Sequence, residues 1–506
     1  CRGRRLASLA RLDSRISPMV HLLPSGKAAP DLATWKVSTN RLVYTFNIRS
    51  NARFSNGHPV TAQDAAFTLQ RMLSPSINPG AGDMLGFFGL IQGATAFAHG
   101  TAKTLTGVTV VNARTLQISL TKPAAYFLGI LATYSSVFDR TVVRGKPVGS
   151  PKDNYQTNYL TNTCTGNQGA GPFRFVCHDR SSTQHSFYSG HTPKYTLVPN
   201  PYYYGHKPHI RLELRAYDKD LDGYKAYLAG TNDTSSSVPL PYLSRWKGKS
   251  KEYHEFPTSR VNYFTPNVHL APFDNLHCRL AVAYDLDRET INKILSGTER
   301  PTYAVVPRGM LGYYPGNDNP HYTPSRARTE LAQCPSRTAP FEVVYATGGT
   351  HDNLFAAIGN MLAAVGMNAK LKPVSADEWF TIVTHPLDQS KTQLVYSGWA
   401  EDYPDPQDYC SVLLRSGSPF NVGGWHNTAY DRLVDRADGL LDARKRAALY
   451  IQAQHLALSQ GAFISVSNNL GWALIKPYVH GLVVSEALNG VGPKDGNWSN
   501  VSVSKH

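Results

Sequence analysis

The sequence predicts an α/β protein with several domains, from its length, its composition and one ordered set of elements. Its 506 residues suggest roughly three domains at about 150 residues each, and the hydrophobic fraction of 42% is sufficient for packed cores. Residues 341–374 show a strand pattern, a helical pattern and a second strand pattern in succession. That succession implies a right-handed crossover and therefore a parallel sheet. No stretch approaches the ~20 apolar residues of a membrane-spanning helix.

The first half of the chain predicts strands, one capped helix and long loops. Residues 42–49 (LVYTFNIR) alternate between apolar and polar side chains, which predicts a half-buried strand. Thr61 and Asp64 form a capping box at the start of a helix whose apolar residues keep helical spacing. Residues 108–120 predict two strands joined by a turn. The region 150–260 is rich in Tyr, Gly, Pro and Ser, and predicts strands connected by long loops.

The predicted parallel sheet lies in the second half. Two of its strands are FEVVYA at 341–346 and NAKLKPV at 368–374, on either side of a helix that Gly366 ends. TQLVYSG at 392–398 is expected as a third strand of the same sheet.

Further helices are predicted on both sides of this sheet in the sequence. One is expected over 279–295, with Gly297 at the C-terminal cap. Residues 428–458 are expected to be helical, with Leu441 on the apolar face and a second helix starting at Arg444.

An acidic motif follows the third predicted strand in a chain whose formal net charge is +15. Residues 396–410 read YSGWAEDYPDPQDYC and contain no Lys or Arg. Ligands of open α/β sheets bind outside the carboxyl ends of the strands, so this position favours a binding site. The acids of the motif are Glu401, Asp402, Asp405 and Asp408.

Catalytic and metal-binding motifs are missing from the sequence. There is no G-x-S-x-G elbow and no H-E-x-x-H motif, and no carboxylate or cysteine joins His206 and His209 at metal-ligand spacing. Adjacent residues such as Glu401 and Asp402 usually diverge in direction, which makes them a poor acid/base pair. We therefore expect no enzyme, no metal and no cofactor, and a hydrolase using the acids of 397–408 is the less favoured alternative.

The excess of 51 Lys+Arg over 36 Asp+Glu does not indicate nucleic-acid binding. The positive charges are scattered, and no helix-turn-helix, RNA-binding or zinc-finger pattern accompanies them. Solubility or a charged cell-envelope setting is the favoured interpretation, and no nucleic-acid partner is expected.

The cysteines leave two questions open. Cys164 and Cys177 enclose a short Gly-rich loop, so they form either a disulfide in an oxidising compartment or a pair of buried free thiols. The chain begins at Cys1, which is typical of a mature lipoprotein with a lipidated cysteine, and also of a truncated chain.

Many ordered segments together resemble one family, the extracytoplasmic solute-binding proteins of peptide, dipeptide and nickel ABC importers, called family 5. The resemblance runs along nearly the whole sequence from residue 30. The segments that carry it include PDLATWKVS (30–38), YTFNIRSNARFSNGHPVTAQDAAFTLQRM (44–72), GVTVVNARTLQISLTKP (107–123), GAGPFRF (169–175), NPYYYGHKP (200–208), PFDNLHCRLAVAYDLDRETI (272–291), VVPRGMLGYYP (305–315), SGWAEDYPDP (397–406) and YDRLVDRA (430–437).

The resemblance implies a two-lobed clamp of the periplasmic-binding-protein type II class, with an extra inserted subdomain in the first lobe and a ligand cleft between the lobes. The first lobe would comprise residues 1–40, 151–262 and 478–506, with the inserted subdomain at 41–150. The second lobe would comprise residues 263–477.

The resemblance also implies a ligand site at Gly398, Trp399, Ala400 and Asp402. Asp402 would pair with the α-ammonium group of a peptide, because an unpaired buried charge is costly. Trp399 would be an aromatic wall of the site or a packing residue, and both readings stay open. The remaining acids are assigned to the turn, with Asp405 shaping it or capping the next helix.

The expected function is that of a monomeric, non-catalytic binding protein outside the cytoplasm. It would bind short oligopeptides and deliver them to the transmembrane subunits of an ABC permease, with membrane tethering through Cys1 as one option. The alternative is the same scaffold with a non-peptide solute, such as an oligosaccharide, an opine or a metal chelate.

Overall fold

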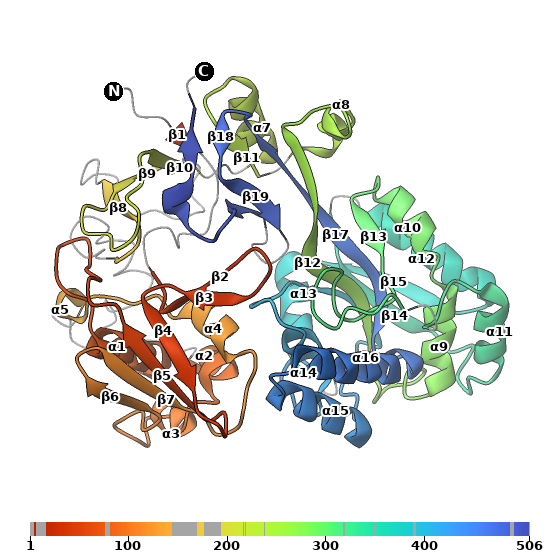
Figure 1. The fold of residues 1–506 in the computed structure, drawn as a ribbon. Helices are drawn as coiled ribbons and strands as arrows, with labels where there is room; N and C mark the ends of the chain where they lie inside the picture. Colours follow the sequence, from red (N-terminus) through yellow and green to blue (C-terminus); the bar gives the residue numbers. More distant parts are fainter. Residues whose placement is uncertain are drawn as a thin grey trace. The chain divides into compact units, whose positions relative to one another are not determined.

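The chain forms two compact units in a computed structural model (Figure 1). One unit comprises Cys1–Phe256 with Trp472–His506, and the other comprises Pro257–Gly471. The residue boundaries predicted for the lobes and for the inserted subdomain stay predictions. The structure describes residues 5–6, 17–75, 81–143, 169–176, 194–215, 217, 219–236, 238–316, 319–348, 351–387, 391–485 and 490–504.

The first unit contains two four-stranded sheets, with strand orders β4-β5-β7-β6 and β1-β10-β9-β8. Short hairpins β2-β3 and β19-β20 and the pair β18-β21 accompany them. The elements are β1 (Arg5–Leu6), β2 (Val20–Leu22), β3 (Ala28–Pro30), β4 (Ala33–Val37), β5 (Val43–Ile48), α1 (Ala62–Leu73), α2 (Ala81–Phe88), α3 (Ala94–Ala98), β6 (Val108–Asn112), β7 (Thr115–Ser119), α4 (Phe127–Tyr134), α5 (Arg140–Val143), β8 (Phe173–Val176), β9 (Lys194–Pro199), β10 (Arg211–Arg215), α7 (Asp220–Leu228), β11 (Thr234–Ser235), α8 (Leu243–Trp246), β18 (Val479–His480), β19 (Leu482–Ser485), β20 (Gly490–Pro493) and β21 (Ser502–Val503).

The elements predicted near the N-terminus are confirmed. In β5, Tyr44 and Phe46 are buried and their neighbours are more exposed, as the alternating pattern requires. Helix α1 begins with the predicted capping box, in which the Thr61 amide donates to Asp64 Oδ2 at 2.9 Å. The strands β6 and β7 pair as an antiparallel hairpin around the predicted turn.

The second unit is a three-layer α/β/α arrangement around a sheet with strand order β17-β12-β16-β14-β15, to which β13 adds on β17 (Figure 1). The predicted parallel crossover is confirmed, because β14 pairs in parallel with both β15 and β16. The elements are β12 (Tyr253–Pro266), α9 (Leu276–Asp285), α10 (Arg288–Ile294), β13 (Glu299–Pro301), α11 (Pro324–Ala332), β14 (Phe341–Ala346), α12 (His351–Val365), β15 (Ala369–Val374), α13 (Ala376–Val383), β16 (Leu394–Trp399), α14 (Gln407–Leu414), α15 (Thr428–Gly439), α16 (Ala443–Ser459) and β17 (Ile464–Ile475).

Each face of this sheet carries its own hydrophobic core. On one face, Phe264 of β12 and Tyr396 of β16 pack with apolar residues of α9, α10, α11 and α12. On the other face, Val261 and Tyr263 of β12 pack with residues of α14, α15 and α16. Successive residues of a strand point to opposite faces, so β12 and β16 serve both cores. The ends of these two strands are therefore held firmly from both sides.

The sequence analysis did not identify the two long strands that carry the chain between the units. Strand β12 begins in the first unit and continues into the second, and β17 makes the return crossing. Neither strand has a simple alternating pattern, because β12 and β17 face a core on both sides over part of their length. A search for alternating apolar and polar residues therefore does not detect these two strands.

The predicted single helix over 279–295 is wrong, because the structure has two helices, α9 and α10. Leu286 adopts an extended backbone with φ −74° and ψ 108°, which ends α9. The side chain of Asp287 then accepts a hydrogen bond from the Thr290 amide at 3.1 Å and caps α10. Gly297 follows α10 with the expected left-handed φ of 69°.

The helical region 428–458 is confirmed as α15 and α16, with one correction. Leu441 was expected on the apolar face of the first helix, but it is 48% exposed. Helix α15 ends at Gly439, and Asp442 caps α16 by accepting from the Arg444 amide at 3.0 Å, so Leu441 lies in the link between the helices.

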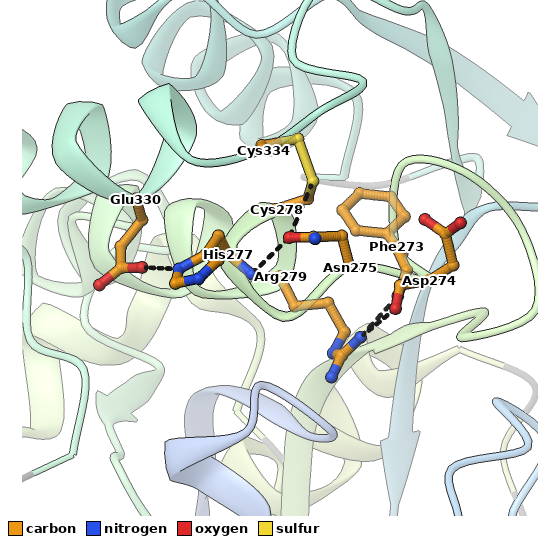
Figure 2. Close-up of a disulfide and its surroundings, with 8 residues drawn as sticks. All are labelled: Phe273, Asp274, Asn275, His277, Cys278, Arg279, Glu330 and Cys334. Carbon is orange, nitrogen blue, oxygen red and sulfur yellow. Dashed lines mark hydrogen bonds and ion pairs between the residues drawn. A yellow bond between two sulfur atoms is a disulfide. The ribbon is translucent and has the colours of Figure 1, made fainter.

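A disulfide joins Cys278 of α9 to Cys334, which follows α11 (Figure 2). Their Cα atoms are 5.0 Å apart and the two cysteines are separated by 56 positions in the sequence. The sequence analysis did not pair them, whereas its own candidates, Cys164 and Cys177, lie outside the described residues. Cys410 is buried as a free thiol.

No helix in the described ranges combines the length and hydropathy that crossing a bilayer requires.

Candidate functional site

The residues expected at the site lie together at the carboxyl end of β16. Gly398 and Trp399 are the last two residues of this strand, and Ala400 and Asp402 follow in the loop that leads to α14. All four are half-buried. The neighbouring strand β12 runs antiparallel, with Val261 opposite Trp399. The site therefore lies at the carboxyl end of a central strand, where ligands of open α/β sheets bind.

Asp408 is a buried residue that holds two of the predicted site residues in place. Its side chain is fully buried at the start of α14. One carboxylate oxygen, Oδ2, accepts a hydrogen bond from the Asp402 amide at 2.8 Å and a second from Trp399 Nε1 at 3.1 Å. One buried oxygen thus holds the backbone of Asp402 and the ring of Trp399 at the same time.

Burial is the main influence on the ionisation of Asp408. Removal from water raises the pKa of this carboxyl well above its usual range, and the nearby charge of Asp402 raises the pKa further. The hydrogen bonds from the Asp402 amide and the Trp399 indole act in the opposite direction. The sequence analysis had assigned Asp408 to the turn, but its contacts make it the support of two predicted site residues.

Trp399 has the packing role that the sequence left open for it, and its role as a wall of the ligand site stays a prediction. Its ring packs partly against the core on the α14–α16 face and meets the ring of Phe420 edge-on, with centroids 5.1 Å apart. Its indole nitrogen is engaged by Asp408. The rest of the ring is accessible, since the residue is only half-buried.

Asp405 has the predicted turn role and one further contact. Its Oδ1 accepts a hydrogen bond from the Gln407 amide at 2.9 Å in the first turn of α14. Its Oδ2 also accepts from Nη1 of the buried Arg446 at 2.6 Å, which ties the loop to α16. Asp405 is therefore committed to holding the loop. Glu401 is buried next to these acids.

Gly398 is required by a close approach of two side chains from β12. A methyl group at this position would lie 2.3 Å from Nη2 of Arg260 and 2.6 Å from Oδ1 of Asn262. The sequence analysis missed both residues, because they precede the motif by more than a hundred positions and only strand pairing brings them to it. No local pattern could have identified them.

His206, His209 and one cavity belong to the first unit, whereas the predicted site residues belong to the second. His206 and His209 are exposed, and the described residues contain no group of three or more potential metal ligands. A cavity of about 170 Å³ in the first unit is lined by Asp31, Arg49, Tyr204 and others, and it contains none of the predicted site residues. The hydroxyl of Tyr204 already donates to Asp31.

Known proteins resemble the chain over most of its length. The family model for the middle part of the bacterial extracellular solute-binding proteins, family 5, matches residues 27–421. The dipeptide-binding protein DppE of Bacillus subtilis is 28% identical over 454 residues, which cover 85% of this chain and 77% of DppE. Heme-binding protein A of Haemophilus influenzae is 27% identical over 482 residues, covering 90% of this chain and 82% of that protein.

A solved structure confirms the fold class. The periplasmic murein tripeptide-binding protein MppA, in its unliganded open form, matches with a TM-score of 0.78 at 22% identity, and the match covers 100% of this chain and 98% of MppA. The two-lobed, type II periplasmic-binding-protein fold with α/β composition is thus established. The named proteins differ in what they bind, so their names leave the ligand of this chain open.

Proposed function

The chain belongs to family 5 of the bacterial extracellular solute-binding proteins, and from this membership we propose that it binds short peptides at the carboxyl end of β16. Asp402 is assigned to the α-ammonium group of the peptide, and Gly398, Trp399 and Ala400 to its main chain and first side chains. The proposed role is delivery, without catalysis, to the transmembrane subunits of an ABC permease.

The placement of Asp402 is the observation that carries this proposal. Its backbone is fixed by Asp408 at the end of a strand that is packed on both faces, and its side chain is half-buried. A half-buried carboxylate loses part of its hydration and gains most from a cationic partner that binds there. An ammonium group next to a peptide main chain is shared by all peptides, so this anchor suits a ligand class with variable side chains.

The acidic surroundings favour a cationic group over a hydrolytic role. The backbone of Asp402 and the ring of Trp399 share one support in Asp408, and Asp405 is engaged by Arg446. Asp408 and Asp405 are thus engaged in holding the loop, which makes them poor candidates for an acid/base partner of Asp402. The named relatives are likewise binding proteins.

A non-peptide solute is the second candidate, and one observation favours it. Heme-binding protein A is about as similar to this chain as the dipeptide-binding protein is, at 27% and 28% identity. A large aromatic ligand would use Trp399 and the partly exposed ring of Phe420, which lie edge-to-face, more than the charge of Asp402.

The disulfide supports a location outside the cytoplasm. Disulfides persist in oxidising compartments, and Cys278–Cys334 is a cross-link between packed helices of the second unit. We propose that the protein works there as a monomer.

The test of peptide binding compares wild-type protein with Asp402→Asn in calorimetric titrations of Ala-Ala-Ala. We expect the substitution to weaken binding by about 1–3 kcal/mol, because it removes the charged partner of the ammonium group. N-acetylated Ala-Ala-Ala should bind both proteins equally weakly.

Two results would contradict the proposal. Equal affinity of wild type and Asp402→Asn for the free peptide would remove Asp402 as the anchor. Native mass spectrometry that finds heme, a sugar or a metal chelate in the purified protein would favour the second candidate.

A further inference from the structure

Arg260 of β12 presents an unused guanidinium group beside the proposed site. Its Nε donates to Oδ1 of Asn262 at 3.1 Å. In the part of the chain that the structure describes, its two terminal nitrogens make no hydrogen bond, and the side chain forms no ion pair. The residue is half-buried, so the guanidinium has lost part of its hydration without gaining an anionic partner.

The guanidinium group of Arg260 is held in one orientation by its neighbours. Asn262, which orients it, is buried and donates in turn to Oδ1 of Asn469 at 2.6 Å. The Nη2 atom lies over Gly398, where any side chain would collide with it. The nearby acid Glu299 accepts a hydrogen bond from Ser467. A pre-oriented guanidinium needs little reorganisation to bind a planar anion.

We propose that Arg260 binds a carboxylate of the ligand, opposite in charge to the group that Asp402 binds; this assignment rests on the proposed peptide-binding function. A guanidinium presents parallel N–H donors that match the two oxygens of a carboxylate. The carboxylate comes from the C-terminus of the peptide or from an acidic side chain, and the two sources are separable by experiment.

The distance between Arg260 and Asp402 limits the length of a ligand that contacts both side chains. Arg260 lies over Gly398, and Asp402 is four positions after Gly398 in the sequence. An extended chain spans at most about 3.3–3.6 Å per residue, so the two positions are no more than ~14 Å apart along the backbone. A peptide of up to about four residues matches this span. Short peptides should therefore gain the most from a free C-terminus.

The experiment measures the affinity of wild type and Arg260→Gln for Ala-Ala-Ala and for its C-terminal amide. Wild type should bind the free acid about 10- to 100-fold more tightly than the amide, as for a charge-assisted hydrogen-bonded pair. In Arg260→Gln this ratio should fall to near one. Arg432→Gln, which removes an exposed arginine on α15, is the matched control and should keep the wild-type ratio.

A third peptide separates the two sources of carboxylate. Ala-Glu-Ala amide has an acidic side chain and no C-terminal charge. If wild type binds it more tightly than Ala-Ala-Ala amide, and Arg260→Gln abolishes that preference, the side-chain carboxylate is the partner of Arg260. This result supports the assignment as much as a C-terminal preference does.

The remaining outcomes overturn the assignment. A free-acid preference that survives in Arg260→Gln would place the carboxylate elsewhere while leaving peptide binding intact. Failure of wild type to bind any of the peptides would overturn the proposed function and this assignment together. If Arg260→Gln does not fold, Gly398→Ala serves instead, because its methyl group displaces the guanidinium from its present position and should reduce the same ratio.

Discussion

At the start of α14 the buried carboxylate of Asp408 accepts hydrogen bonds from the Asp402 amide and the Trp399 indole. At the end of α9 the buried carboxylate of Asp285 receives no hydrogen bond from the described part of the chain. Burial raises the pKa of both carboxyls, that of Asp285 to about 7. Both belong to the second unit. The two buried acids nevertheless differ in what they do: Asp408 accepts hydrogen bonds from its neighbours, and Asp285 accepts none from the described residues.

Asp408 positions residues of the proposed site, whereas the burial of Asp285 lowers the stability of the folded protein when its carboxyl group is ionised. Asp408 compensates for its burial by holding two groups of the proposed site. Asp285 holds none of the described groups in this way, and its last-turn position in α9 places it at the negative end of the helix dipole. The charge of Arg328 lowers its pKa and offsets only part of the effect of burial. The helix pair α9 and α11 is instead held by the covalent link Cys278–Cys334 and by the hydrogen bond between His277 Nδ1 and Glu330 Oε2, 2.7 Å apart (Figure 2). Stability and recognition are thus assigned to different regions of one unit.

The largest expected effect is on the cross-linked helix pair. Replacing both Cys278 and Cys334 by Ala should lower the free energy of unfolding by about 2–5 kcal/mol, because the open chain of the unfolded state gains conformational freedom. Urea denaturation measures this change. Peptide affinity should stay within about twofold of wild type, since both cysteines belong to the core on the α9–α12 face, whereas Trp399 packs against the core on the α14–α16 face.

The same double variant also tests the other cysteines. A loss of stability when a reductant is added to this variant would indicate a disulfide between Cys164 and Cys177. An unchanged urea midpoint would indicate free thiols at these two positions. A marked loss of peptide affinity in the double variant would break the proposed separation of stability and recognition.

The second effect concerns Asp285 and depends on pH. Its folded-state pKa of about 7 lies above the ordinary value of 3.8, so the folded protein binds the extra proton between these values. Its contribution to stability is therefore present below pH ~4 and is lost as pH rises through 7. Asp285→Asn should remove this loss and stabilise the protein at pH 8 by on the order of 2–4 kcal/mol.

The measurement for Asp285 is the difference in unfolding free energy between variant and wild type at pH 4.5, 6 and 8. This difference should grow with pH. Asp377→Asn, at an exposed position in the first turn of α13, is the control. It should show a destabilisation of at most about 1 kcal/mol at pH 8, opposite in sign to the effect of Asp285→Asn. A pH-independent difference for Asp285→Asn would show that the acid is already ionised without cost.

The smallest effect on stability is expected at Asp408, where recognition should suffer more. Asp408→Leu leaves the Asp402 amide and the Trp399 indole without their acceptor, which should cost about 1–3 kcal/mol in unfolding free energy. It should also weaken peptide binding, because the Asp402 backbone is no longer held. Asp408→Asn keeps one carbonyl oxygen as an acceptor and should restore most of both properties.

A thermodynamic cycle sharpens the test of Asp408. If it acts by positioning Asp402, then Asp402→Asn should weaken peptide binding less in the Asp408→Leu background than in wild type. Full additivity of the two substitutions would mean that Asp408 stabilises the fold without positioning the anchor.

Local patterns were sufficient for the elements whose signals are local. The capping box at Thr61, the strand of residues 43–48 and the β14–α12–β15 crossover all depend on side chains within a few positions of one another. The acidic motif after β16 was located in the same way, because a strand end and a turn are adjacent in sequence. The break between α9 and α10 was missed because Asp287 caps one helix within a continuous helical pattern.

By itself, the sequence determined the α/β class, the parallel crossover and the position of the acidic motif at a strand end, since each is encoded by neighbouring residues. Only the tertiary structure decided that Cys278 pairs with Cys334, that Asp408 supports Asp402 and Trp399, and that Arg260 lies over Gly398. The physical reason is that disulfides, buried acceptors and cross-strand contacts depend on distances in space. Strand pairing and helix packing set those distances between positions that are remote in the chain, or adjacent but divergent in direction.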